Sequence, residues 1–188
     1  MAERRRDPYN LDPELLKVIR SEFSMEGVVD ELSQRIKAEG FSESIGKDVY
    51  IAFAEKLAKK VVEAGEQYDD LVYESIRKEV VDVLGEYYRF PSILQRFIEI
   101  AYLALFPVLI TLDVFVGTLT KLSFRLPDCP MYEKLKEDCP EVAPELPCRH
   151  GCLALGEAIS RELNFPDVKY SMAKSITEHG LCVFEANR

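Results

Sequence analysis

The sequence is short of basic residues relative to acidic ones. Lys and Arg number 24 and Asp and Glu number 33, which gives a formal net charge of −9 at pH 7. A field of that sign repels phosphate groups and anionic lipid headgroups. The single basic cluster, Arg4 to Arg6, is expected to be a solvated end of the chain. The charge therefore argues against nucleic acid and membrane surfaces as partners.

Several patterns that mark common chemistry are also missing. The sequence contains no Gly-rich phosphate loop, no Gly-x-Ser-x-Gly, no His-Glu-x-x-His and no EF-hand loop. It shows no signal peptide, and the uncharged run from Ile100 to Leu112 is shorter than the roughly 20 apolar residues of a membrane span. We therefore expect a soluble, cytoplasmic protein, with no support for nucleotide hydrolysis or serine-hydrolase chemistry.

Hydrophobic residues recur at helical spacing as far as about residue 120. The pattern predicts about five helices: one starting at Asp12-Pro13-Glu14, one ending at Gly40, one from Ser42 or Ser44 to Gly65, one over about 67–88, and one opened by Pro91. The last would include Ile100–Leu119 as a buried helix kinked at Pro107. The residues expected in the core share a four-residue interval: Val49, Phe53, Leu57, Val61, Ile76, Val80 and Leu84.

The remaining third of the chain has a different residue pattern, with alternating apolar residues and many prolines. Residues 121–126 alternate as in a strand, residues 127–147 hold five prolines and read as a loop, and residues 153–163 favour a short helix. Residues 168–172 and 181–184 predict a C-terminal β-hairpin around Gly180. The predicted fold class is α+β: an N-terminal helical bundle (residues 1–120) and a small Cys-rich α+β module (residues 121–188), or one continuous domain.

Cysteine is absent from the first 128 residues and then occurs five times, at Cys129, Cys139, Cys148, Cys152 and Cys182. Three explanations stay open. Disulfides would need an oxidising compartment and would leave one thiol over. Unrelated buried thiols would not be expected to avoid the whole helical half. A metal or iron–sulfur site accounts for the clustering.

The local spacing favours the metal site. Cys129 and Cys139 each precede a proline, as cysteines beside iron–sulfur clusters do, and Cys148-Arg-His-Gly-Cys152 places two thiols and His150 within five residues. If the strands before Cys129 and around Cys182 share a sheet, both thiols can reach the 148–152 segment. We therefore predict that Cys129, Cys148, Cys152 and Cys182 bind an iron–sulfur cluster, or alternatively zinc. Cys139 is then spare, and His150 is a further candidate ligand.

A family resemblance covers residues 120–188. Cys129-Pro-Met-Tyr132, Cys148-Arg-His-Gly-Cys152 and the closing segment from Ser175 to Phe184 together resemble the C-terminal pattern of L-2-amino-thiazoline-4-carboxylate hydrolase-like proteins. They are similar, more loosely, to the 4-vinyl reductase type of small-molecule-binding domain. The resemblance implies that Cys129, Cys148 or Cys152, and Cys182 converge around a pocket or metal. The aspartate that the hydrolase-like proteins carry after the middle cysteine is absent here.

Two functions follow as hypotheses. The first is a metal- or iron–sulfur-binding protein whose Cys-ligated centre lies beside a small-molecule pocket, with a redox or ligand-sensing role. The second is a metal- or thiol-dependent hydrolase acting on a small C–N or C–S substrate. The missing aspartate favours the first, because hydrolysis needs a positioned general base. The apolar surface expected on Ile100–Leu119 also predicts a homodimer.

Overall fold

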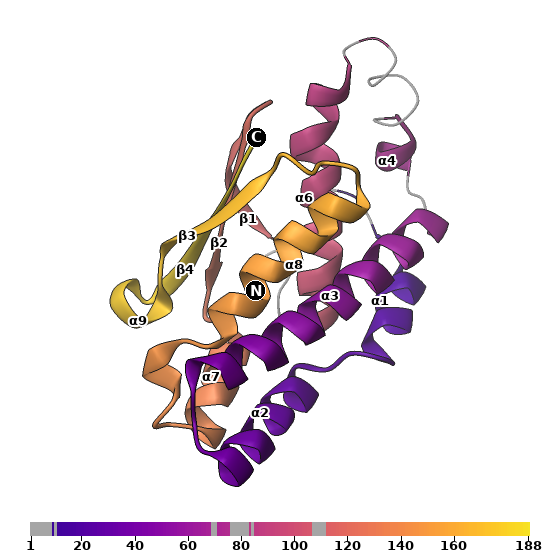
Figure 1. The fold of residues 1–188 in the computed structure, drawn as a ribbon. Helices are drawn as coiled ribbons and strands as arrows, with labels where there is room; N and C mark the ends of the chain where they lie inside the picture. Colours follow the sequence, from indigo (N-terminus) through magenta and orange to yellow (C-terminus); the bar gives the residue numbers. More distant parts are fainter. Residues whose placement is uncertain (1–8, 10, 69–70, 76–82, 84, 107–111) are drawn as a thin grey trace, which may run out of the picture.

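A computed structural model describes residues 9, 11–68, 71–75, 83, 85–106 and 112–188, and shows a mixed α and β fold (Figure 1). Its helices are α1 (Pro13–Arg20), α2 (Met25–Glu39), α3 (Glu43–Gln67), α4 (Leu71–Ser75), α6 (Glu86–Leu105), α7 (Pro130–Asp138), α8 (Cys148–Glu162) and α9 (Ile176–His179), with the 3-10 turn η2 (Ala143–Glu145). Its strands are β1 (Asp113–Gly117), β2 (Lys121–Pro127), β3 (Lys169–Lys174) and β4 (Leu181–Asn187). The arrangement is compatible with the predicted α+β class.

The starts of α1 and α3 and the end of α2 lie where the capping residues predict, whereas α3 continues past the predicted end at Gly65 to Gln67. The side chains of Asp12, Ser24 and Ser42 accept hydrogen bonds from backbone amides in the first turns of α1, α2 and α3. Gly40 ends α2 with φ of 78°, a conformation that suits glycine. Local sequence therefore determines these helix boundaries.

The predicted helix over 67–88 is not continuous. Helix α3 runs to Gln67, and Gly85 with φ of 77° starts α6, which contains Pro91 in its interior rather than at its start. Of the residues predicted to be buried, Val49, Leu57 and Val61 are buried and Phe53 is half-buried. The others, Ile76, Val80 and Leu84, lie outside the described residues.

The prediction of one helix over Ile100–Leu119 is wrong. Helix α6 ends at Leu105, Phe106 has non-helical torsion angles, and residues 113–117 form strand β1. Pro107 lies outside the described residues. The β-branched and aromatic residues Val114, Phe115 and Val116 suit a strand, and β1 gains backbone hydrogen bonds by pairing with β2. Hydrophobicity alone did not separate a buried helix from a strand here.

The C-terminal third differs from its prediction in two helices. Residues 127–147 contain α7, with Pro130 in its first turn, where a missing amide costs nothing. Helix α8 begins at Cys148, so the Cys148–Cys152 segment is helical rather than a loop. Strand β2 and the β3–β4 hairpin occur as predicted, with α9 inserted between the hairpin strands.

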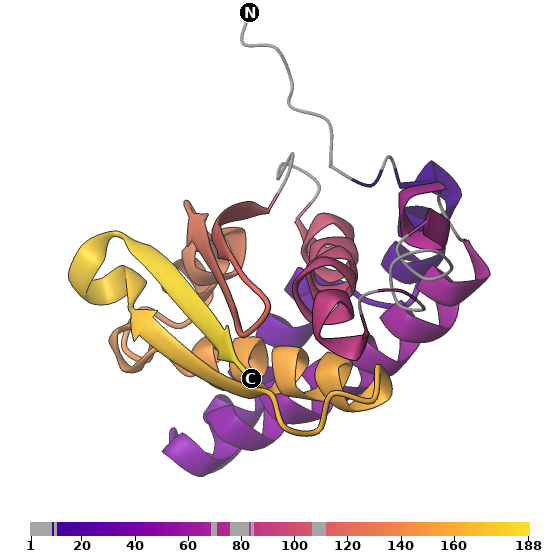
Figure 2. The ribbon, with the colours of Figure 1, turned by 90° about the horizontal axis from the view of Figure 1, so that it is seen from above.

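The four strands form one antiparallel sheet in the order β1-β2-β4-β3. Leu126 of β2 lies opposite Cys182 of β4, and the stacked rings of Phe124 and Phe184 lie two residues further along. Helices α6 and α8 lie on one side of the sheet, with α3 beyond them (Figures 1 and 2). Buried side chains from the sheet and from the helices on both sides of residue 120 form one contiguous core. Whether residues 1–120 and 121–188 can fold separately stays a prediction.

Helix α8 packs closely on both of its neighbours through glycine. A Cβ atom on Gly151 would lie 3.2 Å from Cβ of Tyr50 in α3, and one on Gly156 would lie 2.3 Å from the ring of Tyr170 in β3. The second distance is a steric overlap, so a side chain at Gly156 would displace the ring. These two contacts set the position of α8 between α3 and the sheet.

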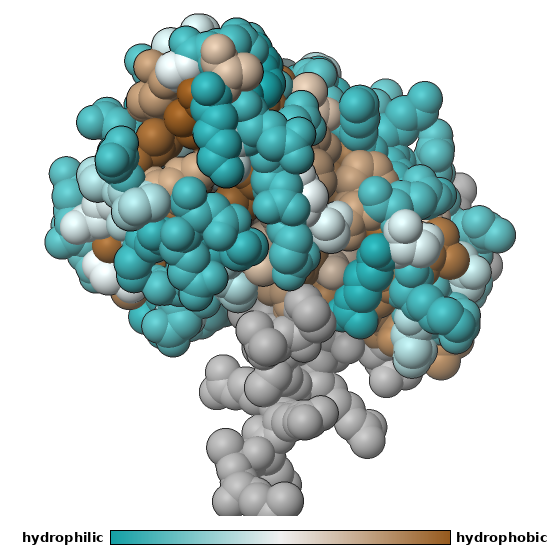
Figure 3. Space-filling model, turned by 90° about the horizontal axis from the view of Figure 1, so that it is seen from below, coloured by the Kyte–Doolittle hydropathy of each residue, from teal (hydrophilic) through white to brown (hydrophobic). Residues whose placement is uncertain are grey.

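The residues from Ile100 to Phe106, which motivated the homodimer, are buried inside the chain. On the face seen in Figure 3, hydrophobic areas are interrupted by hydrophilic side chains. Exposed large hydrophobic residues include Phe115 and Leu119 near the β1–β2 turn. The homodimer stays a prediction, but residues 100–106 no longer supply the exposed apolar surface on which it was based. No helix among the described residues has the length and apolar character to cross a bilayer.

Leu57 provides a direct test of the core. Its side chain is fully buried on α3, so Leu57→Ala should lower the free energy of unfolding by about 2–5 kcal/mol. Leu71→Ala is the matched control, because Leu71 is 84% exposed and the same truncation should change stability by less than about 0.5 kcal/mol. Urea titrations of both variants measure the difference. Equal destabilisation of the two would contradict the placement of Leu57.

Candidate thiol-rich site

Four of the five cysteines line one cavity, here called the cysteine cavity. Cys129 lies between β2 and α7, Cys148 and Cys152 lie in the first turns of α8, and Cys182 lies on β4. The other described lining residues are mostly apolar, with Arg149 as the charged exception. They are Leu126, Met131, Tyr132, Leu146, Arg149, Met172, Ile176 and Phe184. The four thiols that the sequence singled out therefore meet at one place.

Two features of the fold bring these thiols together. Strands β2 and β4 are neighbours, so the end of β2, just before Cys129, lies opposite Cys182. Cys148 and Cys152 are four residues apart on one helix, which places both on the same face of α8. The shared sheet that the sequence argument required is present, and α8 replaces the expected loop.

Cys139 and His150 occupy other positions. Cys139 caps the C-terminus of α7 and is buried, but it is not among the described residues that line the cysteine cavity. His150 is not among them either; its Nε2 atom lies 3.6 Å from the Glu43 carboxylate. Burial, together with the positive charges of Arg149 and Lys47, lowers the pKa of His150. The structure thus separates the spare thiol and the histidine from the four clustered cysteines.

Burial holds the clustered thiols in the neutral form. It raises the pKa of Cys129 to about 11, and it raises the pKa of Cys148, Cys152 and Cys182 above the ordinary value of a thiol. Repulsion among the cysteines adds to this effect at Cys129, Cys148 and Cys152. At neutral pH the metal-free site is therefore a group of uncharged thiols, which are poor nucleophiles.

Nearby donors act in the opposite direction on three of these sulfurs. Backbone amides of Tyr132 and Met131 lower the pKa of Cys129, the Ile176 amide lowers that of Cys182, and the Tyr102 hydroxyl lowers that of Cys152. Such donors stabilise a thiolate once the proton has left. Hydrogen bonds to sulfur are also one of the features by which proteins tune iron–sulfur clusters.

All five cysteines lie within the described residues, and none forms a disulfide. Within the same part of the chain, no three His, Cys, Asp or Glu side chains are arranged so that one metal ion could bind all of them. The four thiols share a cavity without surrounding a single point. The predicted tetrahedral geometry around one ion is therefore not present in this arrangement of side chains.

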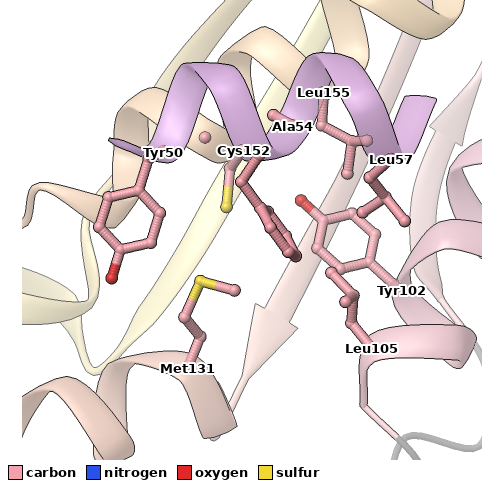
Figure 4. Close-up of a pocket in the computed structure, with 10 residues that line it drawn as sticks. Tyr50, Ala54, Leu57, Tyr102, Leu105, Met131, Cys152 and Leu155 are labelled. Carbon is pink, nitrogen blue, oxygen red and sulfur yellow. The ribbon is translucent and has the colours of Figure 1, made fainter. Parts of the chain in front are cut away.

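A second cavity adjoins the first and is here called the tyrosine pocket (Figure 4). It lies between α3, α6, α7 and α8, and its described lining residues are Tyr50, Phe53, Ala54, Leu57, Tyr102, Leu105, Met131, Gly151, Cys152 and Leu155. Cys152 and Met131 line both cavities. The hydroxyl groups of Tyr50 and Tyr102 are buried without a hydrogen-bond partner among the described residues.

Sequence reasoning did not single out Tyr50, Tyr102 or Met131. Tyr50 follows a residue of the hydrophobic stripe on α3, and Tyr102 lies within the uncharged run of α6. The sequence did contain one signal for them, which is a tyrosine within a stripe of apolar residues. Such a tyrosine is expected to be buried, and its buried hydroxyl normally requires a hydrogen-bond partner. Which cavity such a hydroxyl would face could not be read without the helix packing.

Comparison with models of protein families, with curated proteins and with solved structures found no match.

The raised pKa of Cys129 predicts how the metal-free protein responds to alkaline pH. A thiol that ionises near pH 9 in the unfolded chain and near pH 11 in the folded chain stabilises the fold below pH 9, and this stabilisation is lost as pH rises toward 11. The contribution from Cys129 is about 2–3 kcal/mol. Urea unfolding of chelator-treated protein between pH 8 and 11 should therefore show a smaller alkaline loss for Cys129→Ser than for wild type. Identical pH profiles would contradict the burial of this thiol.

Proposed function

We propose that this protein holds a metal centre, in the first place an iron–sulfur cluster, through Cys129, Cys148, Cys152 and Cys182, beside a small-molecule pocket. Its role would be redox or ligand sensing. The observation that carries the proposal is the convergence of four thiols from three separate parts of the chain on one cavity. A core cysteine that served packing alone would not need three other cysteines at the same cavity.

Metal binding would relieve the electrostatic cost of this cluster. Four buried thiols with raised pKa values cannot ionise together, because their charges would repel one another in a poorly hydrated cavity. A thiophilic cation supplies the missing positive charge, and each ligand loses its proton on binding. Arg149, which also lines the cavity, would offset part of the negative charge of four thiolates.

Between the two metal centres, we prefer a cluster to a single zinc ion. One zinc ion needs four sulfurs at about 2.3 Å from a common point, and the described side chains do not form such a group. A cluster of several iron and sulfide ions holds its cysteine sulfurs farther apart, around a larger body.

Hydrolysis is the weaker hypothesis. No carboxylate and no imidazole is among the described residues that line the cysteine cavity, so none of them is placed there as a general base. The raised pKa values also disfavour a thiolate nucleophile in the metal-free protein. The resemblance to hydrolase-like proteins thus supports the convergence of the cysteines, but the lining of the cavity does not support hydrolysis.

Metal and sulfide analysis of cysteine variants tests the proposal. Wild-type protein purified without oxygen should contain iron and acid-labile sulfide. It should also show a broad absorption band at about 400 nm, which arises from sulfur-to-iron charge transfer. Cys148→Ser and Cys182→Ser should lose most of the iron and the absorbance. Cys139→Ser is the matched control, because Cys139 is equally buried but lies away from the cavity, and it should keep both.

Two results would count against the proposal. Wild-type protein that contains neither iron nor zinc, even after reconstitution with iron and sulfide, would exclude the metal centre. Equal metal loss in Cys139→Ser and Cys182→Ser would show that the cavity does not select the ligands. One zinc ion per chain, lost in Cys182→Ser but not in Cys139→Ser, would support the ligand set and overturn the choice of cluster.

A further inference from the structure

The tyrosine pocket has the composition of a site for a neutral molecule. No charged side chain is among its described lining residues, so a charged ligand would lose its hydration without compensation. The rings of Tyr50, Phe53 and Tyr102 contribute flat apolar surface, and the remaining walls are mainly aliphatic. The apolar and aromatic composition of the lining therefore favours a small, largely apolar ligand with a ring.

The Tyr102 hydroxyl is a polar group within this mainly apolar lining. The Tyr102 side chain is 2% exposed, and its hydroxyl is directed into the pocket toward the side of Cys152 (Figure 4). The hydroxyl lowers the pKa of the nearby Cys152 thiol, but it forms no hydrogen bond of normal geometry with any described residue. A tyrosine hydroxyl is protonated at neutral pH, so it can donate a hydrogen bond to a ligand. An unsatisfied buried donor of this kind is costly unless something binds to it.

The tyrosine pocket also shares a wall with the cysteine cavity. The Cys152 thiol and the Met131 side chain line both spaces, and Met131 is flexible enough to adapt to an occupant. A ligand next to the Tyr102 hydroxyl would thus lie one side chain away from the proposed metal centre. This position lets the ligand alter the environment of the Cys152 sulfur directly.

We infer that the tyrosine pocket binds a neutral, ring-containing small molecule that carries one hydrogen-bond acceptor, which accepts a hydrogen bond from the Tyr102 hydroxyl. The inference extends the proposed function by naming its ligand class, and it rests on that function only for the consequence of binding. The binding itself requires the pocket and Tyr102, not the metal.

Two probes of nearly equal shape test the inference. Acetophenone has a ring and a carbonyl acceptor, and α-methylstyrene replaces the carbonyl oxygen with an apolar CH₂ group. Titration calorimetry or ligand-observed NMR on the full chain, purified without oxygen, should show acetophenone binding about 2- to 10-fold tighter, the range that one hydrogen bond supplies. Tyr102→Phe should bind both probes equally, and its thermal stability should not fall, because it removes an unpartnered hydroxyl.

Two further variants localise the effect. Tyr170→Phe is the matched control: Tyr170 is half-buried near Ser160 and is not among the described residues of the pocket, so the preference for acetophenone should persist. Ala54→Leu should fill the pocket and weaken both probes about 10-fold or more. A preference that survives in Tyr102→Phe, a preference lost equally in Tyr170→Phe, or no binding of either probe at millimolar concentration would overturn the inference.

Metal content measured on the same samples separates this inference from the proposed function. Cys129 lines only the cysteine cavity, so Cys129→Ser should lose the metal and still prefer acetophenone. Acetophenone binding in a wild-type protein that never takes up metal would sustain the pocket and refute the metal centre. Metal uptake without any probe binding would support the metal centre and refute the pocket.

Discussion

The close packing of α8 between α3 and the sheet is the constraint on which the rest of the site depends. Gly151 lets Tyr50 of α3 approach the helix, and Gly156 leaves room for the ring of Tyr170 on the other side. With α8 held by both contacts, Cys148 and Cys152 face the space beneath the sheet. The cysteine cavity and the tyrosine pocket lie on two sides of Cys152 as a result.

The chemistry of the site follows from burying several weak acids together. Each thiol is removed from water, so each holds its proton more strongly than a free cysteine does. The amides beside Cys129 and Cys182 and the hydroxyl beside Cys152 make an eventual thiolate less costly. The site therefore binds protons when empty of metal and would exchange them for a cation, which couples occupancy to pH.

The sequence predicted the parts of the structure that depend on local signals or on composition. Capping residues located the starts of α1 and α3, and the restriction of cysteine to the last 60 residues pointed to Cys129, Cys148, Cys152 and Cys182. Strand β1 was missed because hydrophobicity alone does not separate a short apolar strand, here Val114 to Val116, from a helix. The start of α8 and the presence of α7 were missed because proline was taken to exclude helix, although Pro130 fits a first turn. The tyrosine pocket could not be predicted, since it arises only where three helices from distant parts of the chain meet α8.

X-ray absorption spectroscopy at the metal edge, on full-length protein purified without oxygen or reconstituted with iron and sulfide, tests the central claim most directly. The account predicts a first shell made of sulfur at about 2.3 Å, with a second metal ion beyond it, and loss of that signal in Cys182→Ser. A first shell of nitrogen and oxygen, or a sulfur shell unchanged in Cys182→Ser, would contradict a metal centre held by the four cysteines of the cavity.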